Sequence, residues 1–175
     1  LHLSGLILFF YFLFKQNISS YKSYIFIFLL LLIGIFVAKS HDDFGYYHLP
    51  NALHFSQNKL EFGLGNLNHG FKQHSSIFYL HSIFYLPKIE FYLFNVINFF
   101  FLLFGVYYFY DCVNENISNK KISNISILNT LFLILVTSIF YRIGNYGVDI
   151  TGQILFLTTL SILVKNLINL DNIHK

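Results

Sequence analysis

Residues 41–50 place two adjacent carboxylates beside two tyrosines and two histidines, in the order His-Asp-Asp-Phe-Gly-Tyr-Tyr-His-Leu-Pro. Adjacent carboxylates repel each other unless a proton, a cation or water offsets the repulsion. If the segment is helical, Asp43 shares a face with Tyr47, and Asp42 shares one with Tyr46. The acids could then act as a general base toward an incoming hydroxyl, or bind a divalent cation such as Mg²⁺ or Mn²⁺. The alternative is that they only cap the following helix.

A second polar group follows in residues 69–74, which read His-Gly-Phe-Lys-Gln-His. Lysine stays charged at neutral pH, whereas a neutral histidine donates a single hydrogen bond. We therefore interpret His69, Lys72 and His74 as a cluster that meets a lipid phosphate, with Lys72 as its main contact. The alternative is that these rings rest at a membrane interface with their polar tips in water. No two histidines have the His-x-x-x-His spacing that would indicate zinc.

Residues 142–149, Arg-Ile-Gly-Asn-Tyr-Gly-Val-Asp, form a short connection that could face the acidic segment. Arg142 could reach an anionic carrier. Alternatively, Arg142 and Asp149 form an ion pair that orders the connection. Arg142 thus joins the substrate-binding candidates, which also include Tyr46 and His48 beside the acidic pair.

The composition identifies the elements that must position these residues. The chain has 175 residues, of which 55% are hydrophobic and 11% charged, whereas soluble domains carry about 25% charged residues. Apolar blocks of this length must satisfy their own backbone hydrogen bonds in a membrane, so they are helical. The sequence predicts an all-α fold, a polytopic transmembrane helical bundle, with helices at about 1–14, 21–38, 90–110, 124–141 and 149–168.

Residues 39–89 form the long loop of this predicted bundle and hold six of the eight histidines. Two apolar pieces of the loop, at about 44–56 and 75–86, are too short to span and are predicted to be juxtamembrane helices at the membrane surface. Lysine is denser in the connections at 16–23 and 111–123 and at the carboxyl-terminal end, which places these segments in the cytoplasm and the loop outside it. The net charge of +3 is no nucleic-acid footprint. Because residue 1 is Leu, we expect an amino-terminal fragment of a longer reading frame.

A transmembrane helix followed at once by an acidic pair, aromatic residues and the stretch His-Leu-Pro-Asn-Ala-Leu resembles the first extracytoplasmic loop of GT-C fold membrane glycosyltransferases. The resemblance covers about residues 24–110 and implies sugar transfer from a polyprenyl-phosphate carrier to an acceptor outside the cytoplasm, as in mannosyl- or arabinosyltransferases. It implies that Asp42 or Asp43 is the catalytic base or metal contact. It also implies a cell-envelope role at a bacterial inner membrane.

The chain departs from that pattern because one extra helix precedes the acidic loop, and because the family's remaining helices and any carboxyl-terminal soluble domain are missing from the sequence. The resemblance therefore assigns no carrier-binding residues, and we expect the fragment alone to be inactive. The rival hypothesis is a non-catalytic multi-spanning protein, such as a transporter or an assembly subunit, whose loop acids and histidines handle ions or protons. A transporter should hold its ionisable groups near mid-membrane, whereas a transferase should gather Asp42, Asp43 and Arg142 around one cavity at the outer face.

Overall fold

A computed structural model describes residues 21–36, 42–59, 61–73, 75–118, 123–144 and 146–173. Within these ranges the regular elements are helices. In addition, one isolated antiparallel bridge pairs Leu86 with Glu90. The described part of the chain is therefore all-α, as predicted. The predicted first helix, at about 1–14, lies outside the described residues.

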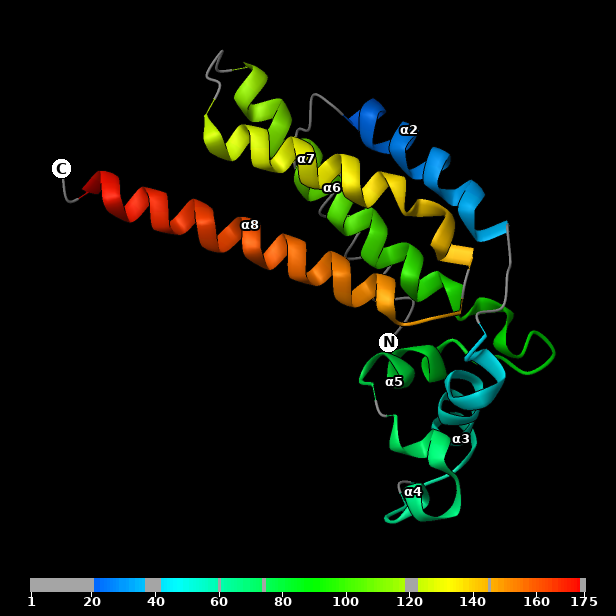
Figure 1. The fold of residues 1–175 in the computed structure, drawn as a ribbon. Coiled ribbons are helices and arrows are strands. Elements are labelled where there is room, and N and C mark those ends of the chain that lie inside the picture. The colour runs from blue at the N-terminus through cyan, green and yellow to red at the C-terminus, as the bar shows by residue number, and fades with distance from the viewer. Residues whose placement is uncertain are drawn as a thin grey trace.

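Four helices form an elongated group (Figure 1). The helix α6 lies in the middle and packs against the other three. Short 3₁₀ turns follow two of them, at Ile33–Phe36 after α2 and at Phe140–Gly144 after α7. The four helices are α2 (Tyr21–Leu32), α6 (Asn95–Ser118), α7 (Asn124–Ser138) and α8 (Asp149–Ile173).

The core of this group is apolar and closely packed. Leu102 and Phe109 of α6, Val136 of α7 and Ile154 of α8 are fully buried. Gly105 allows the closest approach, because a Cβ atom there would lie 2.6 Å from Cγ2 of Ile154. A glycine is therefore required where α6 meets α8.

The loop between α2 and α6 folds into short helices. A π-helical turn, η2 (Phe44–His48), leads directly into α3 (Leu49–Gln57), which packs against α5 (Ile77–Ile83). Between α3 and α5 in the sequence come α4 (Leu64–Leu67) and the 3₁₀ turn η3 (His69–Lys72). The loop extends to one side from the end of the four-helix group, and α4 lies at its far tip (Figure 1).

Several helices end at different residues from those predicted. The predicted helix at 90–110 begins at Asn95, after the 3₁₀ turn η4 (Phe91–Leu93), and continues to Ser118. Its last turns are polar and were predicted as a loop, but Asp111 accepts a hydrogen bond from the Tyr24 hydroxyl and Glu115 pairs with Lys165. These contacts stabilise the extension. The second loop helix is shorter at both ends than its predicted 75–86 range, and Pro87 disfavours helical backbone at the residue before it, Leu86.

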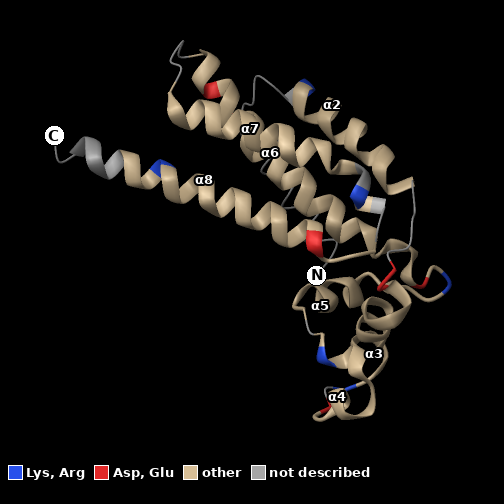
Figure 2. Cartoon of the chain, viewed as in Figure 1, with Lys and Arg blue, Asp and Glu red and all other residues tan. Residues whose placement is uncertain are grey.

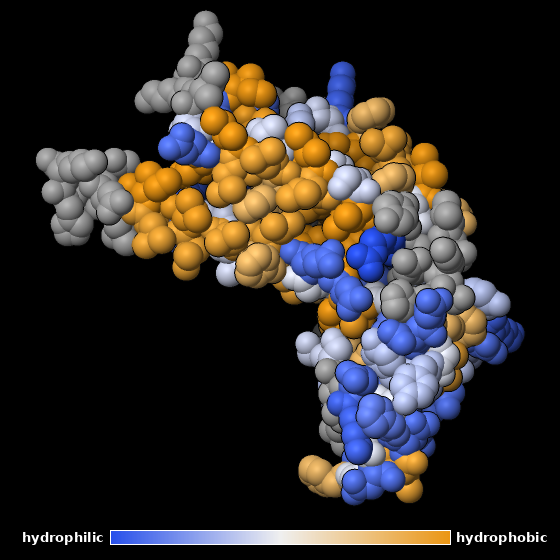
Figure 3. Space-filling model, viewed as in Figure 1, coloured by the Kyte–Doolittle hydropathy of each residue, from blue (hydrophilic) through white to orange (hydrophobic). Residues whose placement is uncertain are grey.

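Two helical stretches, Phe91–Ser118 and Asp149–Ile168, are long and apolar enough to cross a membrane. The other two members of the group, at Lys22–Phe36 and Asn124–Ser138, are apolar but shorter. Charged residues are sparse along the four helices (Figure 2). In Figure 3 the visible face of the helices is mainly hydrophobic, whereas that of the loop is mainly hydrophilic.

The close contact at Gly105 yields a first prediction. Gly105→Ala should destabilise the protein by about 1–3 kcal/mol, because the new methyl group must displace Ile154. Gly152→Ala on α8 is the matched control, since a Cβ atom there meets nothing within 4 Å. Thermal unfolding in detergent, followed by circular dichroism, should show a lower Tm for Gly105→Ala alone. Equal Tm values for the two variants would contradict the packing described.

Candidate functional site

The acidic pair lies where the loop begins, at the start of η2. The backbone carbonyl of Asp43 accepts hydrogen bonds from the amides of Tyr46, Tyr47 and His48, at 3.2, 3.1 and 3.4 Å. Its side chain makes no capping hydrogen bond; instead, the Tyr47 hydroxyl donates to Oδ2 of Asp43 at 3.4 Å. Asp43 and Tyr47 thus share a face, as their spacing predicted, and the capping alternative does not describe the Asp43 carboxylate. Asp42 is exposed.

Asp149, the first residue of α8, lies close enough for its negative charge to act on the same tyrosine. Burial, the negative charges of Asp43 and Asp149, and the hydrogen bond to Asp43 together raise the pKa of Tyr47 above its ordinary value of 10.0. Tyr47 is therefore a protonated donor at neutral pH. The connection at residues 142–149 thus faces the acidic segment, and the residue that it adds to this site is Asp149.

Arg142 is not paired with Asp149. It is half-buried in the 3₁₀ turn η5 (Phe140–Gly144), and no ion pair joins it to Asp149, although both residues belong to the described chain. The alternative reading of this connection, an Arg142–Asp149 ion pair, is therefore not formed between these two described residues. The aromatic ring of Tyr146, between these two residues, packs on Phe44 with ring centroids 4.7 Å apart, and this contact holds the connection against η2.

Behind the acidic segment lie two buried histidines. His48 is only 2% exposed, and its ring lies edge-on to Tyr47 with centroids 4.2 Å apart. The His48 ring forms part of the wall behind the acidic segment, and its role in substrate binding stays a prediction. His81 of α5 stacks on Phe94 at 5.4 Å. Burial and the neighbouring His48 lower the pKa of His81 to about 4, so the His81 ring is neutral at pH 7.

One buried amide connects this wall to the helices. Asn98 of α6 donates from Nδ2 to the Gly147 carbonyl at 2.8 Å and accepts at Oδ1 from the Thr151 hydroxyl at 3.0 Å. Its side chain also hydrogen-bonds His81. Asn98 thus joins α5, the connection before α8 and the first turn of α8. Sequence reasoning missed this residue, although an amide within an apolar segment is costly to bury and signals a specific role.

The second predicted cluster lies next to the first. The Tyr46 hydroxyl is 3.3 Å from Nδ1 of His69, and Asn51 donates to the carbonyls of both Tyr47 and Gly70, at 2.7 and 3.2 Å. A Cβ atom on Gly70 would lie 2.5 Å from the Tyr46 carbonyl oxygen, so only glycine permits this approach. The turn η3 is therefore fixed against η2. Lys72, at the end of η3, is exposed.

Two predicted features are not decided by these contacts. His74 lies outside the described residues. Among the described residues, no three or more His, Cys, Asp or Glu side chains form a group that could hold a metal ion. The cation site at Asp42 and Asp43 therefore stays a prediction.

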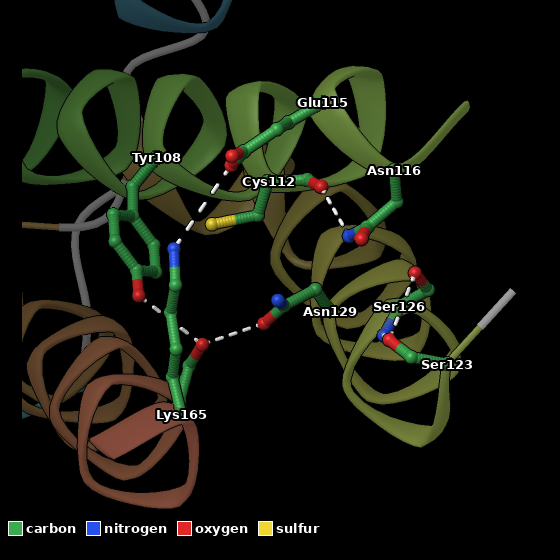
Figure 4. A network of polar contacts seen from close by, with 9 residues as sticks. Tyr108, Cys112, Glu115, Asn116, Ser123, Ser126, Asn129 and Lys165 are labelled. Carbon is green, nitrogen blue, oxygen red and sulfur yellow. Dashed lines mark hydrogen bonds and ion pairs between the residues drawn. The ribbon is translucent and has the colours of Figure 1, made fainter. Parts of the chain in front are cut away.

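A separate polar network joins the far ends of α6, α7 and α8 (Figure 4). The Ser161 hydroxyl donates to Oδ1 of Asn129 at 2.5 Å and lies 3.3 Å from the Tyr108 hydroxyl. Nearby, Lys165 and Glu115 form an ion pair at 3.9 Å. This network belongs to helix packing, because its residues lie on the three helices it joins and none is on the loop.

The role of Asn98 generates a second prediction. Asn98→Leu should lower the free energy of unfolding by about 1–3 kcal/mol, because the buried Gly147 carbonyl and the Thr151 hydroxyl lose their partner. Asn116→Leu is the control on the same helix, since Asn116 donates to the Cys112 carbonyl one turn away, within α6 itself. Denaturant unfolding should distinguish the two variants. An equal decrease in the free energy of unfolding in both variants would show that the Asn98 hydrogen bonds stabilise the fold no more than that of Asn116.

His81 generates a third prediction. The unfolded chain protonates this ring near pH 6.5, whereas the folded chain does so only near pH 4. Between these values the unfolded state binds more protons, so stability should fall as the pH drops from about 6.5 toward 4. His81→Phe, which keeps a ring against Phe94, should show a shallower fall in Tm over this range. Parallel pH profiles for the two proteins would exclude His81 as the source.

The comparison with protein families gives one match. Residues 3–174 match the family described as Domain of unknown function (DUF8201). No curated protein and no solved structure matches the chain. The family description assigns no activity, so the roles of Asp43, Tyr47 and Asp149 are argued from their geometry. Because the match extends over nearly the full sequence, the chain belongs to the DUF8201 family.

Proposed function

We propose that this chain is part of a polytopic membrane glycosyltransferase that transfers a sugar from a polyprenyl-phosphate carrier to an extracytoplasmic acceptor. The observation that carries the proposal is the group formed by Asp43, Tyr47 and Asp149, where the loop meets the start of α8. Carboxylates placed beside a phenol donor suit proton transfer from an acceptor hydroxyl. The resemblance of residues 24–110 to GT-C enzymes supplies the reaction class.

The membrane setting rests on the helices. Two of them are long and apolar enough to span, and the two shorter apolar helices pack beside α6. In the proposed topology all four cross a bacterial inner membrane. The density of lysine in the connections at 16–23 and 111–123 supports an extracytoplasmic position for residues 39–89. The site then lies at the outer face, where a lipid-linked donor would present its sugar.

The proposed chemistry is an inverting transfer. The Asp43 carboxylate accepts the proton of the acceptor hydroxyl while the hydroxyl oxygen attacks the anomeric carbon. The bond from that carbon to the carrier phosphate breaks, and the phosphate leaves with the bonding electrons. Tyr47 orients the Asp43 carboxylate through its hydroxyl. Asp42 is the alternative base, and the two acids together could instead hold Mg²⁺ or Mn²⁺ against the leaving phosphate.

Positive groups must offset the charge of the departing phosphate. Lys72 is the first candidate, because η3 is fixed against η2 through Asn51 and the Tyr46–His69 contact. Arg142 is the second, since it precedes the connection that Tyr146 holds against Phe44. Both side chains would act as phosphate contacts in the loaded enzyme.

The rival hypothesis, a transporter or assembly subunit, receives less support. An ion or proton path through the helices needs ionisable groups inside them. The polar side chains buried within the described parts of α6, α7 and α8 are Asn, Thr and Ser, with none from Asp, Glu, Lys, Arg or His. The described acids instead lie in the loop and near helix ends, which favours surface chemistry.

Substitution of the acids gives a fourth prediction. In the full-length protein, Asp43→Asn should lower sugar transfer from a polyprenyl-phosphate donor by about 10²- to 10⁴-fold, the usual contribution of a general base. Asp42→Asn should be compared in the same assay. Glu115→Gln is the control, since this acid lies on the far end of α6 and pairs with Lys165. If both Asp42→Asn and Asp43→Asn kept full activity, the catalytic assignment would be wrong.

A further inference from the structure

The tip of the loop carries two apolar side chains in full contact with solvent. Phe62 is 105% exposed and Leu67 is 82% exposed, the two highest values among the large hydrophobic residues of the described chain. Phe62 precedes a tight turn at Gly63, whose φ of +87° is a left-handed conformation suited to glycine, and Leu67 is the last residue of the short helix α4. Such exposure is unfavourable in water and indicates a surface that is covered in use.

The charges beside the tip point to the covering partner. Lys59 and Lys72 are exposed on either side of the turn in sequence, and Glu61 is the one described acid between them, so the segment has a net positive charge. Lys72 also lies against α4, because its Cγ atom is 3.0 Å from the position that a Cβ atom on Gly65 would take. Exposed aromatic and leucine side chains flanked by lysines suit an anionic bilayer surface.

The position of the tip agrees with this partner. The loop leaves the end of the four helices and runs to one side, past the start of α8, instead of continuing along the helix axes (Figure 1). If the helices cross a membrane, as proposed above, a loop that runs sideways follows the surface of that membrane. The tip at α4 then lies over lipid beyond α8.

We propose that Phe62 and Leu67 insert into the outer leaflet of the membrane that holds the helices, while Lys59 and Lys72 bind anionic lipid headgroups. This inference rests on the membrane setting of the proposed function. It needs no catalytic activity. The inserted tip would anchor the part of the loop farthest from the helices and so keep η2 and η3 at the level of the lipid headgroups.

Residues 1–175 contain no tryptophan, so a single tryptophan introduced there reports on one position once the emission of the unsubstituted protein is subtracted. The full-length protein is placed in nanodiscs of anionic lipid, with Phe62→Trp or Leu67→Trp as two independent variants. We expect brominated lipids to quench each emission by about twofold or more, and acrylamide in the buffer to quench it weakly. Unquenched emission with brominated lipid and strong acrylamide quenching at both positions would place the tip in water and overturn the proposal.

Phe156→Trp is the matched control, because Phe156 is exposed on α8 in the middle of the apolar stretch. If brominated lipid quenches position 156 but neither tip position, the tip proposal fails while the membrane setting holds. If it does not quench position 156, the membrane setting fails and the tip proposal fails with it. In Phe62→Trp, adding Lys59→Gln and Lys72→Gln should reduce quenching in anionic nanodiscs to the level in zwitterionic ones. Equal quenching with and without the lysines would overturn their role.

Discussion

The hydrogen bonds of Asn98 are the constraint on which the candidate site depends. A primary amide buried between apolar helices must satisfy both its donor and its acceptor, or it costs more than it contributes. Asn98 meets this requirement by binding Gly147, Thr151 and His81, which belong to three separate segments. Satisfying one side chain therefore fixes the loop helix α5 and the start of α8 relative to α6. Asp149 lies two residues from both Gly147 and Thr151, so its position follows from the same bonds.

The aromatic contacts complete what Asn98 begins. His81 stacks on Phe94, and Tyr146 packs on Phe44, which follows the acidic pair directly. Through these rings the acidic segment rests on α6 and on the connection to α8. The carboxylates of Asp43 and Asp149, which are far apart in sequence, consequently act on one phenol, Tyr47. A site built in this way needs side chains from both the loop and the helices. Its residues therefore could not be identified from either segment alone.

The sequence predicted the local features of this arrangement better than the distant ones. Helical periodicity was enough to place Asp43 and Tyr47 on one face, and apolar length was enough to predict α2, α6, α7 and α8. The sequence pattern did not predict that α6 continues through Asp111 and Glu115. These acids contact Tyr24 and Lys165, which lie on other helices. The burial of His48 and the hub at Asn98 were missed for the same reason. Both depend on tertiary contacts that leave no periodic signal.

The start of α8 faces the acidic segment, and the titration of the Tyr47 hydroxyl reports directly on this arrangement. NMR of protein labelled with ¹³C at the tyrosine ring carbon that bears the hydroxyl, with the Tyr47 signal assigned through Tyr47→Phe, would give the pKa of this one phenol. We expect a pKa above the ordinary value of 10.0 in the native protein and a lower pKa in Asp149→Asn. An unchanged Tyr47 pKa in Asp149→Asn would show that α8 does not reach the acidic segment and would contradict the account.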